Sequence, residues 1–172
     1  MYPLKIVFLG SIVGAIILII GIKIVKSKIL RKNTIYEIQI KINEKEIKTT
    51  AILDTGNMLK DPITGNPVII VEKEELKKII PEEILENIDS ILGGEINKIE
   101  SKIENKFLSK LKIIPYSSLG KENGILLGIK SDEVYIINED KKYKKENIII
   151  GIYNRKLTKK GEYKALIGMD LI

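Results

Sequence analysis

The stretch KTTAILDTGNMLKDP, residues 48–62, places an ionisable side chain directly after an apolar run. Residues 47–53 alternate like a half-buried strand, and Asp54-Thr55-Gly56 follows them. A carboxylate in this position is costly unless it is hydrogen-bonded or paired. Gly56 allows a tight turn whose N–H groups face the carboxylate, and the Thr55 hydroxyl can brace that turn. The triplet therefore predicts a rigid mount for Asp54.

The 172-residue chain contains neither Cys nor His. This excludes disulfides, thiolate nucleophiles, Ser–His pairs and metals ligated by Cys or His. Any catalysis must use Asp, Glu, Lys, Ser, Thr or Tyr. Two carboxyl groups that share one proton fit this inventory, because like charges at close range cannot both ionise. One carboxyl group then acts as base on water and the other as acid on a peptide carbonyl, with no cofactor and no metal.

The N-terminal residues 1–32 carry the whole basic excess of the chain. Six of the 29 basic residues precede position 33 and no acidic residue does, so the remaining 23 basic residues balance the 23 acidic ones. A nucleic-acid partner is therefore not expected. Residues 6–22 are uncharged and predict one membrane-spanning helix, and the Lys and Arg residues after them predict a cytoplasmic C-terminal domain at the cell membrane. A cleaved signal peptide is the alternative, but no small-x-small cleavage site follows the run.

Residues 33–172 are predicted to form one mainly β domain. Alternation over 35–53 predicts a hairpin that ends at Asp54, Asp61-Pro62 predicts a turn, and 68–71 predict a buried strand. Spacings of three and four predict helices over 81–92 and 95–112, within a helical insertion at about 73–112. We expect this insertion to pack on its own domain, with a partner-binding face as the alternative. Further strands are expected at 111–116, 124–129, 134–137, 148–153 and in the closing KALIGMDLI, with a charged turn around 138–146.

Three segments carry a family resemblance: AILDTGN, IIPYSSLGKENGILLGI and ALIGMDLI. In this order they resemble the retropepsin-type aspartic peptidases, in which the active-site triplet precedes a flap hairpin that covers the substrate. More closely, the chain is similar to the membrane-bound sporulation peptidases that process the precursor of sigma factor E. The resemblance covers most of residues 35–172. It implies a retropepsin-like half-barrel with a helical insertion, behind one transmembrane helix where members of that family carry several.

The resemblance also implies roles for particular residues and partners. Asp54 is then the catalytic aspartate, supported by Thr55 and Gly56, and Ser117, Ser118, Leu119 and Gly120 belong to the flap that binds substrate. The implied substrate is the sigma factor precursor, whose N-terminal pro-sequence is removed. The implied activator is a secreted protein from the neighbouring forespore.

The chain contains one Asp-[Ser/Thr]-Gly triplet. A carboxyl dyad therefore requires a second copy, with Asp54 facing Asp54 across a twofold axis. We expect a homodimer that is inactive as a monomer.

Three alternatives remain at this level. The triplet can be an ordinary turn, since Asp and Gly are common turn residues. The domain can be an inactive retropepsin-fold module that is tethered to the membrane and binds a partner. A carbohydrate-active enzyme with two carboxylates is disfavoured, because a chain without Trp and with 5% aromatic residues has few sugar-stacking surfaces.

Overall fold

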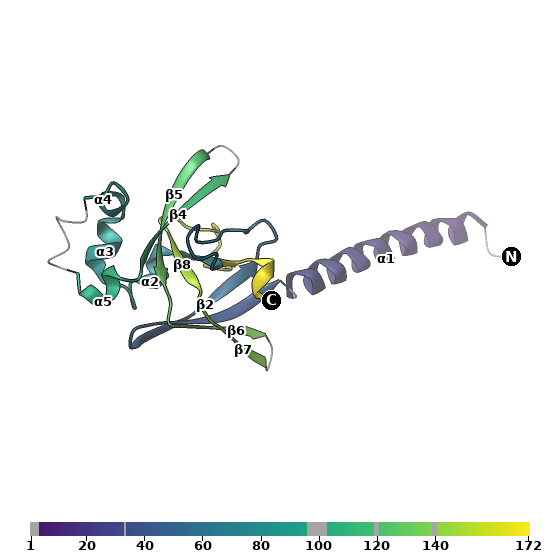
Figure 1. The fold of residues 1–172 in the computed structure, drawn as a ribbon. Coiled ribbons are helices and arrows are strands. Elements are labelled where there is room, and N and C mark those ends of the chain that lie inside the picture. Colours follow the sequence, from purple (N-terminus) through teal and green to yellow (C-terminus); the bar gives the residue numbers. More distant parts are fainter. Residues whose placement is uncertain (1–3, 33, 96–102, 119–120, 139–140) are drawn as a thin grey trace. The chain divides into compact units, whose positions relative to one another are not determined.

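The computed structural model describes residues 4–32, 34–95, 103–118, 121–138 and 141–172. Internal contacts divide the chain into two compact units, residues 1–35 and residues 36–172. The first unit consists mainly of helix α1, Leu4–Lys32 (Figure 1). Apolar side chains along α1 are exposed, among them Phe8, Ile12 and Ile16. Within the described part of the chain, no helix is both long enough and apolar enough to cross a membrane.

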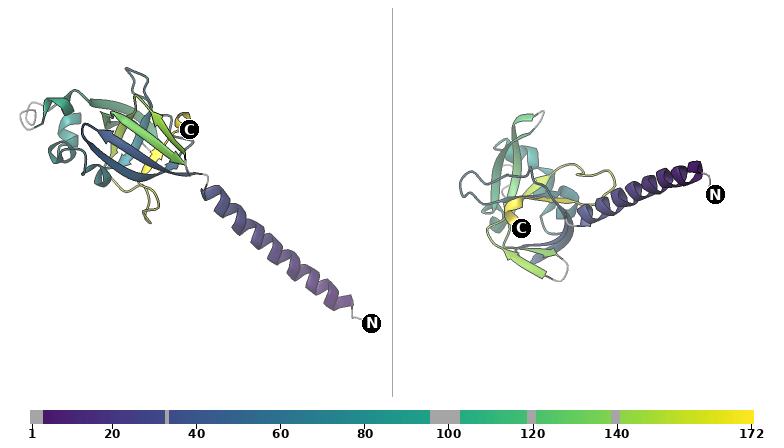
Figure 2. Two further views of the ribbon diagram at one scale, coloured as in Figure 1. Left: turned by 90° about the horizontal axis from the view of Figure 1, so that it is seen from below. Right: turned by 90° about the vertical axis from the view of Figure 1, so that its right-hand side faces the viewer.

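The second unit is built on one sheet with the order β4-β5-β8-β3-β9-β2-β1-β6-β7. The sheet is strongly twisted and coiled (Figure 2). A mainly β domain is therefore confirmed. The strands are β1 Ile35–Ile42, β2 Lys45–Leu53, β3 Val68–Glu72, β4 Leu111–Ser118, β5 Lys121–Lys130, β6 Glu133–Asn138, β7 Lys141–Lys145, β8 Ile149–Tyr153 and β9 Ala165–Ile167.

The predicted β1–β2 hairpin is confirmed. Its turn is Asn43-Glu44, and Asn43 adopts a positive φ of 55° that Asn tolerates better than most residues. The last strand, β9, lies between β2 and β3, parallel to β2 and antiparallel to β3. The position of β9 between β2 and β3 brings the C-terminal residues to the strand end that carries Asp54.

The central strands β3 and β8 are buried on both faces, as their continuous apolar sequences predict. One face contributes to the main core, in which Ile38, Ile69 and Ile150 are fully buried. The other face forms a smaller apolar cluster of Val68, Ile114 and Ile149. The smaller cluster lies under Leu59 and Leu126, two residues that also line the cleft described below.

In its described residues, the helical insertion contains four short α-helices, α2 Lys73–Leu76, α3 Glu82–Glu86, α4 Ile88–Leu92 and α5 Asn105–Leu108. They gather on one side of the sheet (Figure 1). Their apolar residues, including Leu76, Leu85 and Phe107, are buried in the main core. The expectation that the insertion packs on its own domain is therefore confirmed for the described residues.

Two predicted helices and one predicted turn differ from the structure. The helix over 81–92 breaks at Asn87, where the backbone leaves helical values and the side-chain amide donates to the Glu83 carbonyl, 2.8 Å away. The helix over 95–112 is confirmed in its described part only at α5, and β4 already begins at Leu111. Residues 96–102 lie outside the described residues.

The predicted charged turn around 138–146 contains strand β7. It forms the sheet edge, where Lys side chains are common because they discourage pairing with further strands. Lys142 donates to the Gln39 side chain at 2.9 Å and Lys144 pairs with Glu133 at 2.9 Å. The charged sequence was therefore interpreted as a turn, although Gln39 and Glu133 on strands β1 and β6 provide polar partners for the lysines of strand β7.

Candidate active site

Asp54 directly follows β2, as predicted, and is held through both its backbone and its side chain. Its N–H donates to the Ile167 carbonyl of β9 at 2.9 Å, and its carbonyl accepts from the Asn57 N–H at 3.1 Å. The Gly56 N–H donates to one carboxylate oxygen, Oδ1, at 2.9 Å. The predicted contact of the Gly56 N–H with the carboxylate is confirmed, whereas no hydrogen bond of the Thr55 hydroxyl is found among the described residues. Strand β9 holds Asp54 as well.

Asn57 ties the turn to two strands. Its side chain is buried, and the amide lies 3.2 Å from the Val68 carbonyl and 3.4 Å from the Leu166 carbonyl. Its side-chain oxygen accepts from the Leu59 N–H at 3.3 Å. One amide group therefore links the start of β3, strand β9 and the chain beyond Asp54. Sequence analysis did not identify this residue, although Asn directly after Asp-Thr-Gly is visible in the sequence.

Gly168 allows β9 and the Asp54 turn to approach closely. A Cβ atom at this position would lie 2.5 Å from the Asn57 carbonyl oxygen and 2.8 Å from the Asp170 side chain. The backbone of Gly168 has φ −80°, so no conformational constraint requires glycine. Its requirement is steric, because real Cβ atoms essentially never come this close to another heavy atom.

The loop between Asn57 and β3 is closed by Asp61, which is almost fully buried. A hydrogen bond from the Thr64 hydroxyl lowers the pKa of the Asp61 carboxyl group, and the Ile63 and Thr64 N–H groups act in the same direction. The predicted turn at Asp61-Pro62 is thus confirmed. Its Gly65 adopts φ 71° and donates its N–H to the Asp61 carbonyl at 2.8 Å.

Asp54 lies in a cleft of about 560 Å³. The walls are mostly apolar, and Asp54 is the only acidic residue among the described residues that line them. The lining comes from the Asp54 turn, β3, β4, β5, β8, the loop after β8, and β9: Asp54, Gly56, Asn57, Met58, Leu59, Ile70, Tyr116, Ser117, Leu126, Tyr153, Leu157 and Leu166.

The β4–β5 hairpin projects beyond the rest of the sheet and contributes one wall of the cleft (Figure 1). Tyr116 pairs with Gly124 across this hairpin. A Cβ atom on Gly124 would meet the Tyr116 ring at 2.4 Å, so the ring lies against the bare backbone of β5. The glycine therefore sets where the Tyr116 ring can lie at the cleft.

The predicted site residues are partly brought together. Asp54, Gly56 and Ser117 line the cleft, whereas Thr55 is exposed in the turn and does not. Ser118 is the last residue of β4, and Leu119 and Gly120 lie outside the described residues. Tyr153 and Leu157 were missed, because no local pattern shows that the loop after β8 reaches Asp54.

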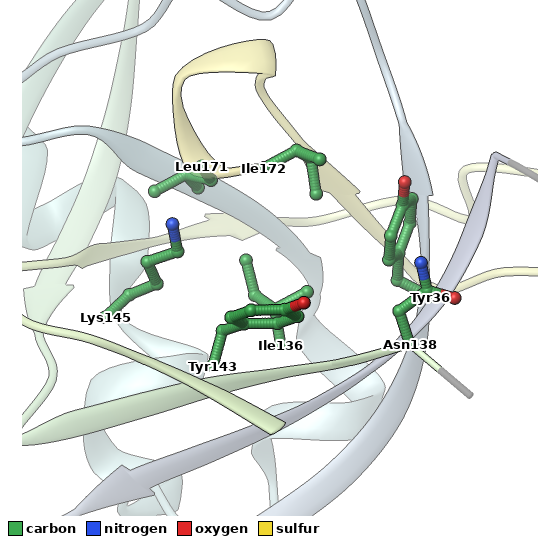
Figure 3. A pocket seen from close by; sticks show the side chains of 7 residues that line it. All are labelled: Tyr36, Ile136, Asn138, Tyr143, Lys145, Leu171 and Ile172. Atoms are coloured by element: carbon green, nitrogen blue, oxygen red, sulfur yellow. The ribbon is translucent and has the colours of Figure 1, made fainter. Parts of the chain in front are cut away.

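A second cavity of about 240 Å³ opens at the β6–β7 end of the sheet (Figure 3). Its described lining contains the Lys145 ammonium group and two tyrosines but no Asp or Glu side chain, so no pair of acidic side chains meets there. The lining residues are Tyr36, Ile136, Asn138, Tyr143, Lys145, Leu171 and Ile172.

The fold and the cleft define a mainly β domain with one aspartate mounted at a strand end. Comparison with known families identifies the chain further. The Peptidase_U4 family model, described as "Sporulation factor SpoIIGA", matches residues 1–171, and the chain belongs to this family. The predicted resemblance to the sporulation peptidases is thereby confirmed.

Two curated relatives illustrate the similarity. The sporulation sigma-E factor-processing peptidase of Priestia megaterium is 30% identical over 139 residues, which are 79% of this chain and 43% of that protein. The protein of the same name from Bacillus subtilis is 31% identical over 143 residues, 79% of this chain and 45% of that protein. The chain thus spans less than half the length of these relatives. No solved structure matches it.

Proposed function

We propose that this protein is a membrane-anchored aspartic endopeptidase that removes the N-terminal pro-sequence of a sporulation sigma factor. Family membership and the names of the relatives support the reaction and the substrate. The observation that carries the aspartic mechanism is the mount of Asp54, a strand-end carboxylate fixed by Gly56 and β9 in an apolar cleft. The retropepsin-like fold is part of the same proposal.

The chemistry requires two carboxyl groups in one site. A carboxylate acts as base and takes a proton from water, and the water oxygen attacks the peptide carbonyl. The second carboxyl group, still protonated, gives its proton to the carbonyl oxygen, which yields a tetrahedral diol. The first carboxyl group then passes the proton it took from water to the amide nitrogen, and the C–N bond breaks. A diol hydroxyl returns its proton to the second carboxylate as the new carboxylic acid forms. Like charges at close range cannot both ionise, so one carboxyl group can stay protonated while the other is a carboxylate. Apolar walls exclude bulk water and strengthen these interactions.

The second carboxyl group would come from a second copy of the chain. Asp54 is the only acid among the described residues that line the cleft, and the sequence holds no second triplet. Twofold symmetry places the same residue of both copies at the axis. We therefore propose a homodimer with one Asp54 from each protomer. A membrane anchor would raise the local concentration and favour such pairing.

A mixing experiment tests both the reaction and the dyad. The full chain is produced with a sigma factor precursor in a host without sporulation proteins, and an immunoblot follows loss of an N-terminal tag from the precursor. We expect processing by the wild-type chain. At a constant total amount of chain, replacing wild type by an Asp54→Asn chain should lower processing in proportion to the square of the wild-type fraction, because only dimers with two wild-type copies hold the dyad.

The control for this mixture is an Asp89→Asn chain, which makes the same charge change at an exposed helix position. It should leave processing unchanged at every ratio. A linear fall with the wild-type fraction would show that each copy acts alone and would contradict the dyad. Absence of processing when a forespore activator is also supplied would contradict the substrate.

The membrane anchor is supported by the uncharged residues 6–22 and by the exposed apolar side chains of α1. We expect the full chain to stay in the membrane fraction after alkaline carbonate washing. Replacing Ile16 and Ile17 by Asp should release it, because charges are costly in the bilayer interior. A matched Lys26→Asp and Lys28→Asp variant, changed beyond the uncharged run, should stay bound. Release of the wild-type chain by carbonate would contradict the anchor.

A further inference from the structure

The segment after β8 carries two positive charges between residues that line the cleft of Asp54. Tyr153 at the end of β8 and Leu157 four residues later both line the cleft. Arg155 and Lys156 lie between these two lining residues, and both are exposed. We call Arg155 and Lys156 the rim pair. Neither cation is part of the cleft lining itself, and both belong to the four-residue step between two lining residues.

Two acidic residues fix this loop to the domain. The Leu157 N–H donates to a carboxylate oxygen of Glu72 at 2.7 Å, and Glu72 is buried at the end of β3. Further along, the Lys164 ammonium group donates to Glu75 at 2.6 Å, and the Lys164 N–H donates to the Thr50 carbonyl at 2.8 Å. The rim pair is therefore carried by a tethered segment. Charges held in this way select a ligand at a lower entropic cost than charges on a free tail.

Neither cation of the rim pair makes an ion pair with an acidic group of the described residues. The charge of Lys156 reaches Glu74, but the Glu74 carboxylate is bonded to Lys77 at 2.8 Å. The chain from residue 33 onward is formally neutral, so two unpaired cations beside the cleft are a local asymmetry. Such an arrangement favours an anionic ligand at this end of the cleft.

We propose that the rim pair makes the cleft selective for extended peptides with an acidic side chain on one side of the apolar residues bound at Asp54. The apolar walls, among them Leu126 and Leu166, fit the uncharged part of such a peptide. The rim pair fits the acidic part and fixes the direction in which the peptide lies. This inference rests on the proposed function, because it assigns the Asp54 cleft to a peptide.

Binding is measured separately from cleavage, with the full-length Asp54→Asn chain in an uncharged detergent. Three short labelled peptides share a central Leu-Leu pair and carry Glu on the N-terminal side, Glu on the C-terminal side, or Gln in place of Glu. We expect fluorescence anisotropy to show one Glu peptide bound about 3-fold more tightly than the Gln peptide. Raising NaCl from about 50 mM to about 500 mM should remove most of that difference.

Replacement of the rim pair tests the assignment. In the Asp54→Asn background, Arg155→Gln with Lys156→Gln should reduce the affinity for the preferred Glu peptide to that for the Gln peptide. The matched control is Lys159→Gln with Lys160→Gln, which removes the same charge from exposed positions of the same loop beyond Leu157. It should keep most of the preference. Thermal unfolding of both variants should match that of the parent chain, because all four side chains are exposed.

The outcomes separate this inference from the proposed function. If the wild-type chain cuts Glu and Gln peptides with equal kcat/KM, the inference is wrong and the peptidase assignment stands. If no peptide is cut but rim-pair-dependent binding of the Glu peptide is found, the inference stands without the reaction. Equal loss of affinity in the control variant would contradict the rim-pair assignment. The assignment would also be contradicted if replacing the rim pair changed only the binding of the chain to vesicles with anionic headgroups, because the loop would then contact lipid.

Discussion

An Asp54→Asn chain should lose sigma factor processing by at least about 1,000-fold. Asn has nearly the same shape as Asp, and its side-chain oxygen can still accept the Gly56 N–H that lies 2.9 Å from Oδ1 in the structure. Asn can neither take a proton from water nor give one to the peptide carbonyl, so the loss falls on the chemical step. The measurement is the rate of precursor shortening in vitro with equal amounts of folded protein.

The same experiment separates loss of chemistry from loss of structure. The midpoint of thermal unfolding should change little, because the backbone bond from Asp54 to Ile167 at 2.9 Å does not involve the side chain. An Asp89→Asn chain should process at the wild-type rate. Processing by the Asp54→Asn chain at the wild-type rate would contradict the aspartic mechanism. The domain would then be a tethered binding module, and another protein would cut the precursor.

Gly168→Ala should have the largest effect on stability. The added Cβ would lie 2.5 Å from the Asn57 carbonyl oxygen, which is backbone and cannot rotate away. Either β9 or the Asp54 turn must then move, and overpacking of this kind costs about 3 kcal/mol. We expect the midpoint of thermal unfolding to fall by roughly 10 °C. Processing should also fall, because Ile167, which accepts the Asp54 N–H, is the neighbouring residue.

Gly93→Ala is a suitable comparison. There the added Cβ would lie 3.3 Å from the Asp89 carbonyl oxygen, so a shift of a few tenths of an ångström relieves the contact. We expect a change in unfolding free energy below about 1 kcal/mol and normal processing. If Gly168→Ala unfolded at the wild-type temperature and processed normally, the close contact between β9 and the Asp54 turn would not support the site as argued.

Local sequence patterns predicted the elements that depend on neighbouring residues. Alternation gave the β1–β2 hairpin, and the apolar run at Val68 gave a strand buried on both faces. Turn chemistry at Asp61-Pro62 and at Asp54-Thr55-Gly56 was read correctly, because these turns are stabilised by groups a few residues apart. Patterns were less reliable where polar partners came from elsewhere, as in β7, where Gln39 and Glu133 pair with its lysines.

By itself, the sequence determined that Asp54 follows a strand on a glycine turn, and that no Cys or His assists it. Only the tertiary structure decided what surrounds that carboxylate. β9 inserts beside β2 from more than a hundred residues away, Gly168 meets Asn57, and Tyr116 and Leu157 reach the same cleft from separate strands and loops. The physical reason is range: a turn is fixed by neighbouring hydrogen bonds, whereas a cleft is fixed by the packing of distant segments, which no local period records.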